Sequence, residues 1–178
     1  MSKKVLSADN QQERVGKSLD PWYITGFVEG EGTFHIALYR DEHMRQGVKI
    51  IPEFHVNQSY LRLVTITSIK QYFGCGYIKA NHPGSTRDTT YVYVVRDRND
   101  LLKKIIPFFR RYPLQSIKQN SFMIFADIVE RMARGEHYTL AGVKIIITRA
   151  YKMNAGGKYR QRTKQELFNN LQSSETIC

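Results

Sequence analysis

Two carboxylates stand at the end of a glycine-punctuated apolar segment, Ile24 to Gly32. The segment reads as a helix, because Asp20 suits its N-cap and Pro21 suits its first position. The C-terminal end of a helix carries partial negative charge, so Glu29 and Glu31 lie unfavourably in its dipole. Mg²⁺ favours one or two carboxylates together with phosphate and water oxygens. The pair is therefore a candidate for metal binding, although paired glutamates are also common on ordinary surfaces.

Two glycines of the same segment, Gly26 and Gly30, are four residues apart and so lie on one face of the expected helix. Each glycine inside a helix costs about 1 kcal/mol relative to alanine. Close approach of another backbone would explain both glycines, since a glycine face removes the side-chain spacer. The alternative is a helix packed tightly inside its own domain, and the spacing does not separate the two.

The elements that follow must position the acids, and they begin with a change of period. Alternation over 33–39 predicts a strand with Phe34, Ile36 and Leu38 on its inward face. A second strand is expected over 48–58, where Pro52 favours a bulge. Helices are then expected over 60–73, 101–109, 116–132, 143–153 and 164–171, with short strands over 75–80 and 89–96.

The element order αββαββα predicts an α+β fold, in which one antiparallel four-stranded sheet carries its helices on one face. Leu61 and Val64 are expected on the inward side of the helix over 60–73, and Asn99 or Asp100 is expected to cap the helix that starts at Leu101. We expect an N-terminal arm over 1–18, a single domain over 19–171 and a tail over 172–178.

The composition favours a polyanionic partner inside a cell. The chain has 178 residues, with 27 lysines and arginines against 16 acids and a formal net charge of +11. Two distant cysteines do not form a disulfide framework. An apolar stretch long enough for a membrane span and a secretory signal are both missing, so neither a membrane nor secretion is expected. A basic protein without a nucleic-acid partner is the plainer alternative.

The segment 24–32 resembles the signature of the LAGLIDADG homing endonucleases. The resemblance extends over roughly residues 19–162. It includes Gly-Cys-Gly-Tyr at 74–77, Tyr-Pro-Leu at 112–114 and the run at 153–158. The sequence departs from the family name by carrying Glu29 and Glu31 in place of aspartates, which keeps both carboxylates. The resemblance implies a saddle-shaped sheet laid along double-stranded DNA.

The resemblance also implies roles for individual residues. Glu31, helped by the Gly30 carbonyl, would bind Mg²⁺, for which Mn²⁺ or Ca²⁺ could substitute, Ca²⁺ without turnover. Glu29 would be more structural. Gln58 would orient the attacking water, Arg62 would line the pocket, and Lys118 would lie near the scissile phosphate. Without the resemblance, Gln58 and Arg62 would be read as an ordinary strand end and a solvated helix face.

One chain carries one signature and so supplies one acid, whereas a double-strand cut needs two. The resemblance therefore implies a homodimer of two-fold symmetry whose signature helices pack together. The expected interface residues are Trp22, Gly26, Phe27 and Gly30.

The outward faces of the expected strands mix donors, acceptors and apolar groups, which suits base edges in a major groove. The candidate DNA contacts on this face and its loops are His35, Ala37, Tyr39, Asp41, Arg45, Lys49, Ile51, Glu53, His55, Tyr77, Lys79 and Asn81. Basic residues around a Gly-Gly loop suit phosphate contacts, namely Lys152, Lys158, Arg160 and Arg162. The alternatives are a solvent-facing sheet and a mobile basic tail.

These observations lead to one function and two alternatives. The resemblance implies an intron-encoded homing endonuclease that hydrolyses both strands of a long near-palindromic site and leaves short 3′ overhangs. It would work in a prokaryotic cytoplasm or an organelle. An intron-RNA maturase or a non-cleaving DNA-binding regulator on the same fold is the first alternative. A basic structural protein is the second.

Overall fold

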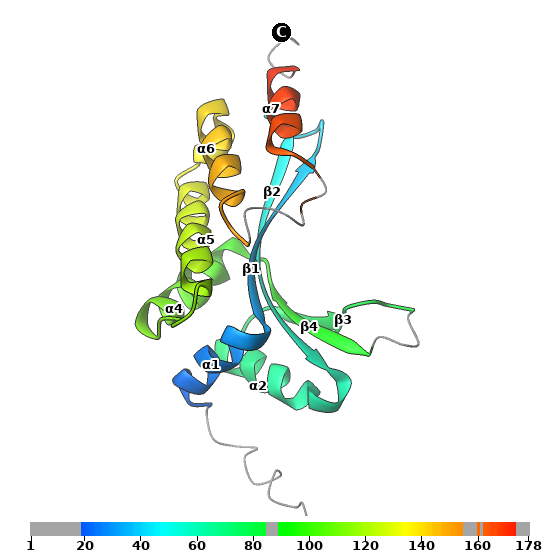
Figure 1. Cartoon of the computed structure of the whole chain (residues 1–178), viewed down its shortest axis with the longest axis vertical. Helices are drawn as coiled ribbons and strands as arrows, with labels where there is room; N and C mark the ends of the chain where they lie inside the picture. The colour runs from blue at the N-terminus through cyan, green and yellow to red at the C-terminus, as the bar shows by residue number, and fades with distance from the viewer. Residues whose placement is uncertain (1–18, 85–88, 155–159, 161, 174–178) are drawn as a thin grey trace, which may run out of the picture.

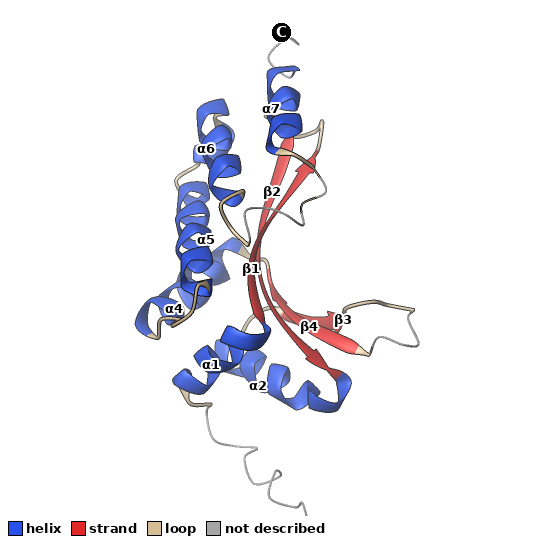
Figure 2. Ribbon diagram, viewed as in Figure 1, coloured by secondary structure: helices blue, strands red, loops and turns tan. Residues whose placement is uncertain are grey.

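The computed structural model describes residues 19–84, 89–154, 160 and 162–173, so the expected N-terminal arm lies outside the described residues. Four antiparallel strands form one sheet in the order β1 (Gly32–Arg40), β2 (Val48–Ser59), β4 (Thr90–Val95) and β3 (Tyr77–Ala80). The sheet is strongly curved, and the helices cover its convex face (Figures 1 and 2). The expected α+β fold and saddle shape are confirmed.

The signature segment forms α1 (Pro21–Glu31), which runs directly into β1 with no residue between them. As expected, Asp20 caps the helix, and its Oδ1 accepts from the backbone N–H groups of Trp22 and Tyr23 at 2.8 and 3.2 Å. At the junction a Cβ on Gly32 would lie 2.4 Å from Val28 Cγ1, so only glycine allows this sharp exit. The end of α1 is therefore fixed to the start of the sheet.

The first hairpin has no bulge, so the expectation at Pro52 was wrong. The β1–β2 register is continuous and pairs Pro52 with Ile36. The Ile36 carbonyl accepts from Arg160 Nη1 at 2.8 Å and so points away from β2, which means that Pro52 needs no N–H toward β1. On its other side β2 pairs with β4 only from Phe54 onward, so the missing N–H breaks no ladder bond there either.

The free edge of β1 is covered by side chains from the segment after α6 (Leu140–Ala150). Asn154 Nδ2 donates to the Phe34 carbonyl at 2.9 Å, next to the Arg160 bond to Ile36. Arg160 Nη2 also donates to the Ala150 carbonyl at 3.0 Å, which ties this edge to the end of α6. An exposed edge strand would otherwise be open to pairing with other chains.

The core lies between the convex face of the sheet and the helices, and aromatic rings fill its centre. Phe34 lies 5.2 to 5.4 Å, centroid to centroid, from four other rings, those of Phe54, Phe109, Phe122 and Phe125. The covering helices are α2 (Leu63–Phe73), α4 (Ile106–Arg111), α5 (Lys118–Ala133), α6 and α7 (Lys164–Ser173). A smaller hydrophobic cluster around Val48, Val143 and Leu167 packs α6 and α7 against β2 near the tip of the first hairpin.

Two helix starts differ from the sequence expectations. Residues 60–62 form a 3-10 turn, η2 (Tyr60–Arg62), ahead of α2, so the helical phase starts later. Leu61 lies in this turn and is 91% exposed. Val64 lies five residues before the buried Ile69, and so on another side of α2, and is 72% exposed rather than inward. Asp97, not Asn99 or Asp100, caps the next helical segment. This segment starts with α3 (Arg98–Asp100) and continues through the π-helix η3 (Leu101–Ile105) into α4.

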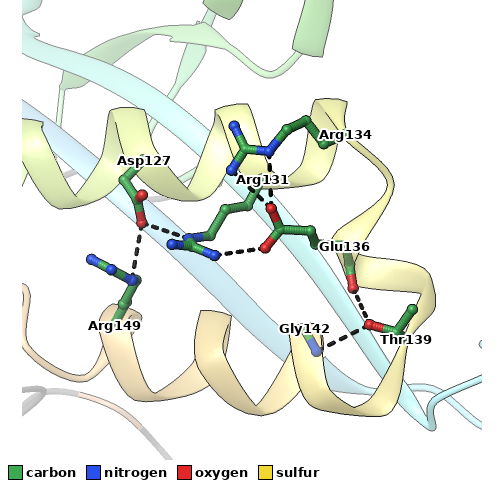
Figure 3. A network of polar contacts seen from close by, with 7 residues as sticks. All are labelled: Asp127, Arg131, Arg134, Glu136, Thr139, Gly142 and Arg149. Atoms are coloured by element: carbon green, nitrogen blue, oxygen red, sulfur yellow. Dashed lines mark hydrogen bonds and ion pairs between the residues drawn. The ribbon is translucent and has the colours of Figure 1, made fainter.

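An ion-pair network joins α5 to α6 through the 3-10 turn η4 (Glu136–Tyr138), as Figure 3 shows. Asp127 Oδ2 binds Arg131 Nε at 3.0 Å and Arg149 Nε at 3.1 Å, while Arg131 Nη1 reaches Glu136 Oε2 at 2.6 Å. Thr139 then caps α6 through the Gly142 N–H at 3.1 Å. The network holds the α5–α6 pair as one layer behind the sheet.

The two glycines that flank Cys75 allow a matched test of this fold. Gly74 and Gly76 both have positive φ, but a Cβ on Gly76 would lie 2.4 Å from the Val94 carbonyl, while one on Gly74 meets nothing within 4 Å. We expect Gly76→Ala to lower the free energy of unfolding by more than about 3 kcal/mol. Gly74→Ala should lower it by about 1 to 2 kcal/mol. Equal losses in urea denaturation would contradict this packing.

Candidate metal and DNA-contact site

The site is built on the last turn of α1, which Lys118 holds from the start of α5. Lys118 Nζ donates to the carbonyls of Val28, Glu29 and Gly32 at 2.8, 2.7 and 2.7 Å. An ammonium has three N–H donors, so these bonds use all of them. A positive charge at a helix C-terminus is favourable, and here it offsets the clustered carbonyl dipoles. Burial lowers the pKa of Lys118 by more than the charges of Glu29 and Glu31 raise it, so the pKa lies below the ordinary value of a lysine.

Glu29 makes the reciprocal contact, because its carboxylate binds Gln115 and Ser116, which lie just before α5. Its Oε1 accepts from the backbone N–H groups of Gln115 and Ser116, the latter at 3.0 Å, and its Oε2 accepts from the Ser116 hydroxyl. Burial raises the pKa of Glu29. The Ser116 hydroxyl, the two backbone N–H groups and the charge of Lys118 lower it by more than burial raises it. The pKa of Glu29 therefore lies below the ordinary value of a glutamate. Each helix end thus receives the charge that its dipole favours.

Glu31 differs from Glu29 in being exposed at the junction of α1 and β1. The three carbonyls that Lys118 binds do not include that of Gly30. A carboxylate and a nearby carbonyl are oxygen ligands that Mg²⁺ accepts. Among the described residues, no three His, Cys, Asp or Glu side chains gather into a metal-ligand group. A metal at Glu31 would therefore need further oxygens from water and phosphate, which is the coordination that Mg²⁺ prefers.

Two further predicted site residues follow at the same end of the sheet. Gly32 pairs with Val56, so Glu31 and Gln58 flank neighbouring strand ends. Gln58 is buried, and its Oε1 accepts from the Ser59 N–H at 2.8 Å. Arg62 is exposed in η2, one turn further along. The structure brings Glu31, Lys118 and Gln58 to one end of the sheet from three separate elements.

The residues expected to contact DNA lie on or beside the concave face, which the helices leave uncovered (Figure 1). Several are exposed there, namely Tyr39, Arg45, Lys49, Tyr77, Lys79 and Asn81, while His35, Asp41, Ile51 and His55 are half-buried. Ala37 and Glu53 are buried although they belong to the same face. Burial and the charge of Arg160 lower the pKa of His35, against the opposing charge of Glu53. A neutral imidazole both donates and accepts hydrogen bonds.

Glu53 is covered because it pairs with a residue that the sequence analysis missed. Its Oε1 forms an ion pair with Arg96 Nε, and its Oε2 lies 3.0 Å from His55 Nε2. The signal was the register of the alternation, since Val95 pairs with Phe54 and Arg96 must then fall on the Glu53 face. Burial raises the pKa of Glu53, but His55 and Arg96 lower it by more, so the pKa lies below the ordinary value of a glutamate.

The basic residues near the C-terminal end do not form one uniform group. Lys152 and Arg162 are exposed, whereas Lys158 lies outside the described residues. Arg160 is half-buried, covers the edge of β1 and stacks over the Tyr151 ring at 4.9 Å. Its guanidinium therefore has a structural task beyond adding charge.

No described residue packs against the glycines on the outward face of α1. A Cβ built on Gly26 or Gly30 meets nothing within 4 Å, so the described residues give no sign of tight packing against these glycines. Trp22 beside them is 52% exposed, and Phe27 is half-buried. Among the described residues, the glycine face is therefore uncovered, and the exposed part of Trp22 lies beside it.

No described helix is both long enough and apolar enough to cross a membrane.

The contact of Glu29 with Gln115 and Ser116 can be tested through pH. Because its pKa is lowered on folding, its stabilisation is present above the ordinary pKa of a glutamate and is lost as pH falls through the lowered value. We expect Glu29→Gln to lower the free energy of unfolding by about 1 to 2 kcal/mol near neutral pH. The difference from the unmodified chain should shrink as pH falls below the ordinary pKa of a glutamate.

Glu31→Gln is the matched control, since it removes the same charge from an exposed position two residues away. A pH-independent difference for Glu29→Gln, measured by urea denaturation, would show that the carboxylate does not stabilise the segment just before α5.

Comparison with known proteins agrees with this geometry. The family model for the LAGLIDADG endonuclease matches residues 24–129, which is more than half of the chain. Among curated proteins, the probable intron-encoded endonuclease 2 of Neurospora crassa is 30% identical over 143 residues, which is 80% of this chain and 31% of that protein. The chain spans about a third or less of the length of the first curated relatives that it matches.

Solved structures of similar fold include two that are 28% and 27% identical in sequence to this chain. The archaeal intron-encoded homing endonuclease I-Vdi141I, complexed with DNA, superposes with a TM-score of 0.77 and 28% identity over 87% of this chain and 96% of that one. I-SmaMI, bound to an uncleaved DNA target in the presence of calcium ions, gives 0.74 and 27% over 90% of this chain and 50% of that one. With its signature helix, saddle-shaped sheet and family match, the chain belongs to the LAGLIDADG endonuclease family.

Proposed function

We propose that this chain is a homing endonuclease that uses a divalent metal to hydrolyse both strands of a long near-palindromic DNA site. The observation that carries the proposal is the exposed Glu31 at the end of α1. Lys118 of α5 binds the carbonyls there, and Glu29 of α1 binds Ser116 just before α5. An acid kept at a helix C-terminus against its dipole, and not used as a cap itself, is suited to binding a cation. We further propose that the cut leaves short 3′ overhangs.

The proposed chemistry assigns a task to each residue at this end of the sheet. Glu31 and the Gly30 carbonyl would hold Mg²⁺, or Mn²⁺ or Ca²⁺ in its place, the last without turnover. The metal, when bound, polarises the phosphodiester, lowers the pKa of water and neutralises the leaving oxygen. Gln58 has its Oε1 engaged by Ser59, so it would orient the attacking water through its Nε2 donors. Arg62 would add positive charge at the phosphate.

Lys118 has a more restricted role in this proposal than a free phosphate ligand. Its three donors are engaged by the α1 carbonyls, so it acts first by holding Glu31 in position. Its charge still lies beside the proposed metal site, where it would stabilise charge that builds up on the phosphate. The two effects are coupled, because moving Lys118 toward DNA would uncap α1.

We propose that two copies assemble through the open face of α1. The expected interface consists of Trp22, Gly26, Phe27 and Gly30, which share the side of the helix that the chain leaves uncovered. Packing this face against its own copy would bring two Glu31 residues together, one for each DNA strand. The match to only half of the I-SmaMI chain supports the view that this chain supplies half of a complete site.

We propose that DNA lies along the concave face of the sheet. The proposed contacts on the sheet and its loops are His35, Ala37, Tyr39, Asp41, Arg45, Lys49, Ile51, His55, Tyr77, Lys79 and Asn81, with Lys152, Lys158, Arg160 and Arg162 toward the phosphates. Glu53, which was expected among them, is buried on this face and would act through its neighbours. The net charge of +11 supports this partner and implies that affinity falls steeply as salt rises. We place the enzyme inside a prokaryotic cell or an organelle.

The acid assignment is tested by Glu31→Gln, which keeps the size of the side chain and removes its charge. We expect cleavage of the target in Mg²⁺ to fall by at least about a thousandfold, with DNA affinity kept within about threefold. Gel assays of cutting and binding measure both effects. Cutting that persists would mean that the acid is misassigned. Specific binding without cutting by the unmodified chain would instead favour a DNA-binding regulator.

The interface is tested by Gly26→Leu, because this position has open space in the single chain. Leucine should raise helix stability by up to about 1 kcal/mol while its side chain blocks contact between two α1 helices. We expect the variant to sediment as a monomer and to lose double-strand cutting. Ala141→Leu, which adds an exposed leucine to α6, is the control and should stay dimeric. A dimer of Gly26→Leu with normal cutting would exclude this interface.

A further inference from the structure

The concave face of the sheet holds a carboxylate that is almost completely covered. Glu53 is only 5% exposed, although it belongs to the face that the helices leave open. Its covering groups come from three strands or their ends: Arg96 after β4, His55 on β2 and His35 on β1. His35 pairs with Glu53 across the strands, and its ring centroid lies 6.5 Å from that of His55.

The geometry of the ion pair leaves one edge of the guanidinium available. Glu53 engages Arg96 through Nε, whereas the side chain of Arg96 as a whole is 45% exposed. The two terminal nitrogens lie beyond the engaged atom and form the fork that binds two acceptors in one plane. Holding a long side chain by its Nε before DNA arrives reduces the rotamer freedom that binding would otherwise remove.

The negative partner also distinguishes a base contact from a phosphate contact. A phosphate contact depends mainly on net positive charge, which Glu53 reduces by pairing with Arg96. Hydrogen bonding to a base depends mainly on the direction of the donors, which Glu53 fixes. A carboxylate behind an arginine therefore weakens attraction to the backbone and sharpens the selection of a base edge.

We infer that Arg96 reads a guanine in the DNA groove through its terminal nitrogens, oriented by Glu53 as a positioning residue. The inference rests on the proposed function, since it requires DNA on the concave face. The O6 and N7 atoms of guanine form the acceptor pair that an arginine fork matches. Glu53 itself is buried beneath Arg96 and His55, so it selects the base indirectly rather than by contact.

The experiment compares base preferences by binding selection from a randomised double-stranded DNA library, with every variant in a Glu31→Gln background to prevent cutting. The parent should select a guanine at one position in each half-site. Adding Arg96→Gln should reduce that preference by about fivefold to a hundredfold and leave the other positions unchanged. Adding Glu53→Gln should weaken the same preference without lowering overall DNA affinity, because it removes a negative charge.

Lys103→Gln is the matched control, since it removes one exposed positive charge from the helix layer. It should leave the preference profile unchanged. A uniform loss of affinity in Arg96→Gln, with an unaltered profile, would overturn the inference in favour of a phosphate contact. If Arg96→Gln changed neither the base preferences nor the affinity, the inference would also be overturned, and the Arg96–Glu53 ion pair would only join two strands. A parent with no base preference at all would overturn the proposed function, and the inference with it.

Discussion

The site depends on a reciprocal exchange of charges between the end of α1 and the start of α5. Lys118 reaches back across 86 to 90 residues of sequence to bind three carbonyls, and Glu29 binds the backbone and the Ser116 hydroxyl just before α5. Without the ammonium, two glutamates and the negative end of a helix dipole would face each other at one point. Because of these contacts, Glu31 can remain exposed at the end of α1, where it is available for a ligand. Removing either partner would leave the other without its counterpart in a partly buried place.

The sheet supplies the second constraint, because α1 has no linker to β1. Gly32 admits only a sharp exit against Val28, so the orientation of the helix is set by the first residue pair of the hairpin. Arg160 and Asn154 then cover the free edge of β1 from the far end of the chain. Segments from both ends of the domain thereby fix one strand. The concave face stays open, and polar side chains can gather there around Glu53.

Local sequence was sufficient to predict α1, its Asp20 cap, the first hairpin and the four-stranded sheet, since each leaves a periodic or capping pattern in neighbouring residues. It was not sufficient where a distant partner decides the outcome. Pro52 is accommodated because Ile36 faces Arg160, and Leu61 is exposed because the 3-10 turn delays the helical phase. The bonds of Lys118 to the carbonyls at the end of α1 and the Arg96–Glu53 ion pair likewise depend on tertiary neighbours.

The glycine face shows how the structure adds to a pattern that the sequence left ambiguous. Gly26 and Gly30 fitted both an internal contact and a contact between chains, and the open space around their Cβ positions favours the second. The same helix would then form the interface between copies and hold the metal-binding acid beside it. Assembly and chemistry would share one element, so the position of each Glu31 would depend on the partner helix.

The most direct measurement uses heterodimers of one unmodified chain and one Glu31→Gln chain, purified through two different affinity tags. If each copy supplies the acid for one strand, a supercoiled plasmid with a single target site should be converted to the nicked form in Mg²⁺ and should not become linear. Homodimers of the unmodified chain, prepared in the same way, should linearise it. Linearisation by the heterodimer at the rate of the unmodified homodimer would contradict the account, because one Glu31 would then suffice for both strands.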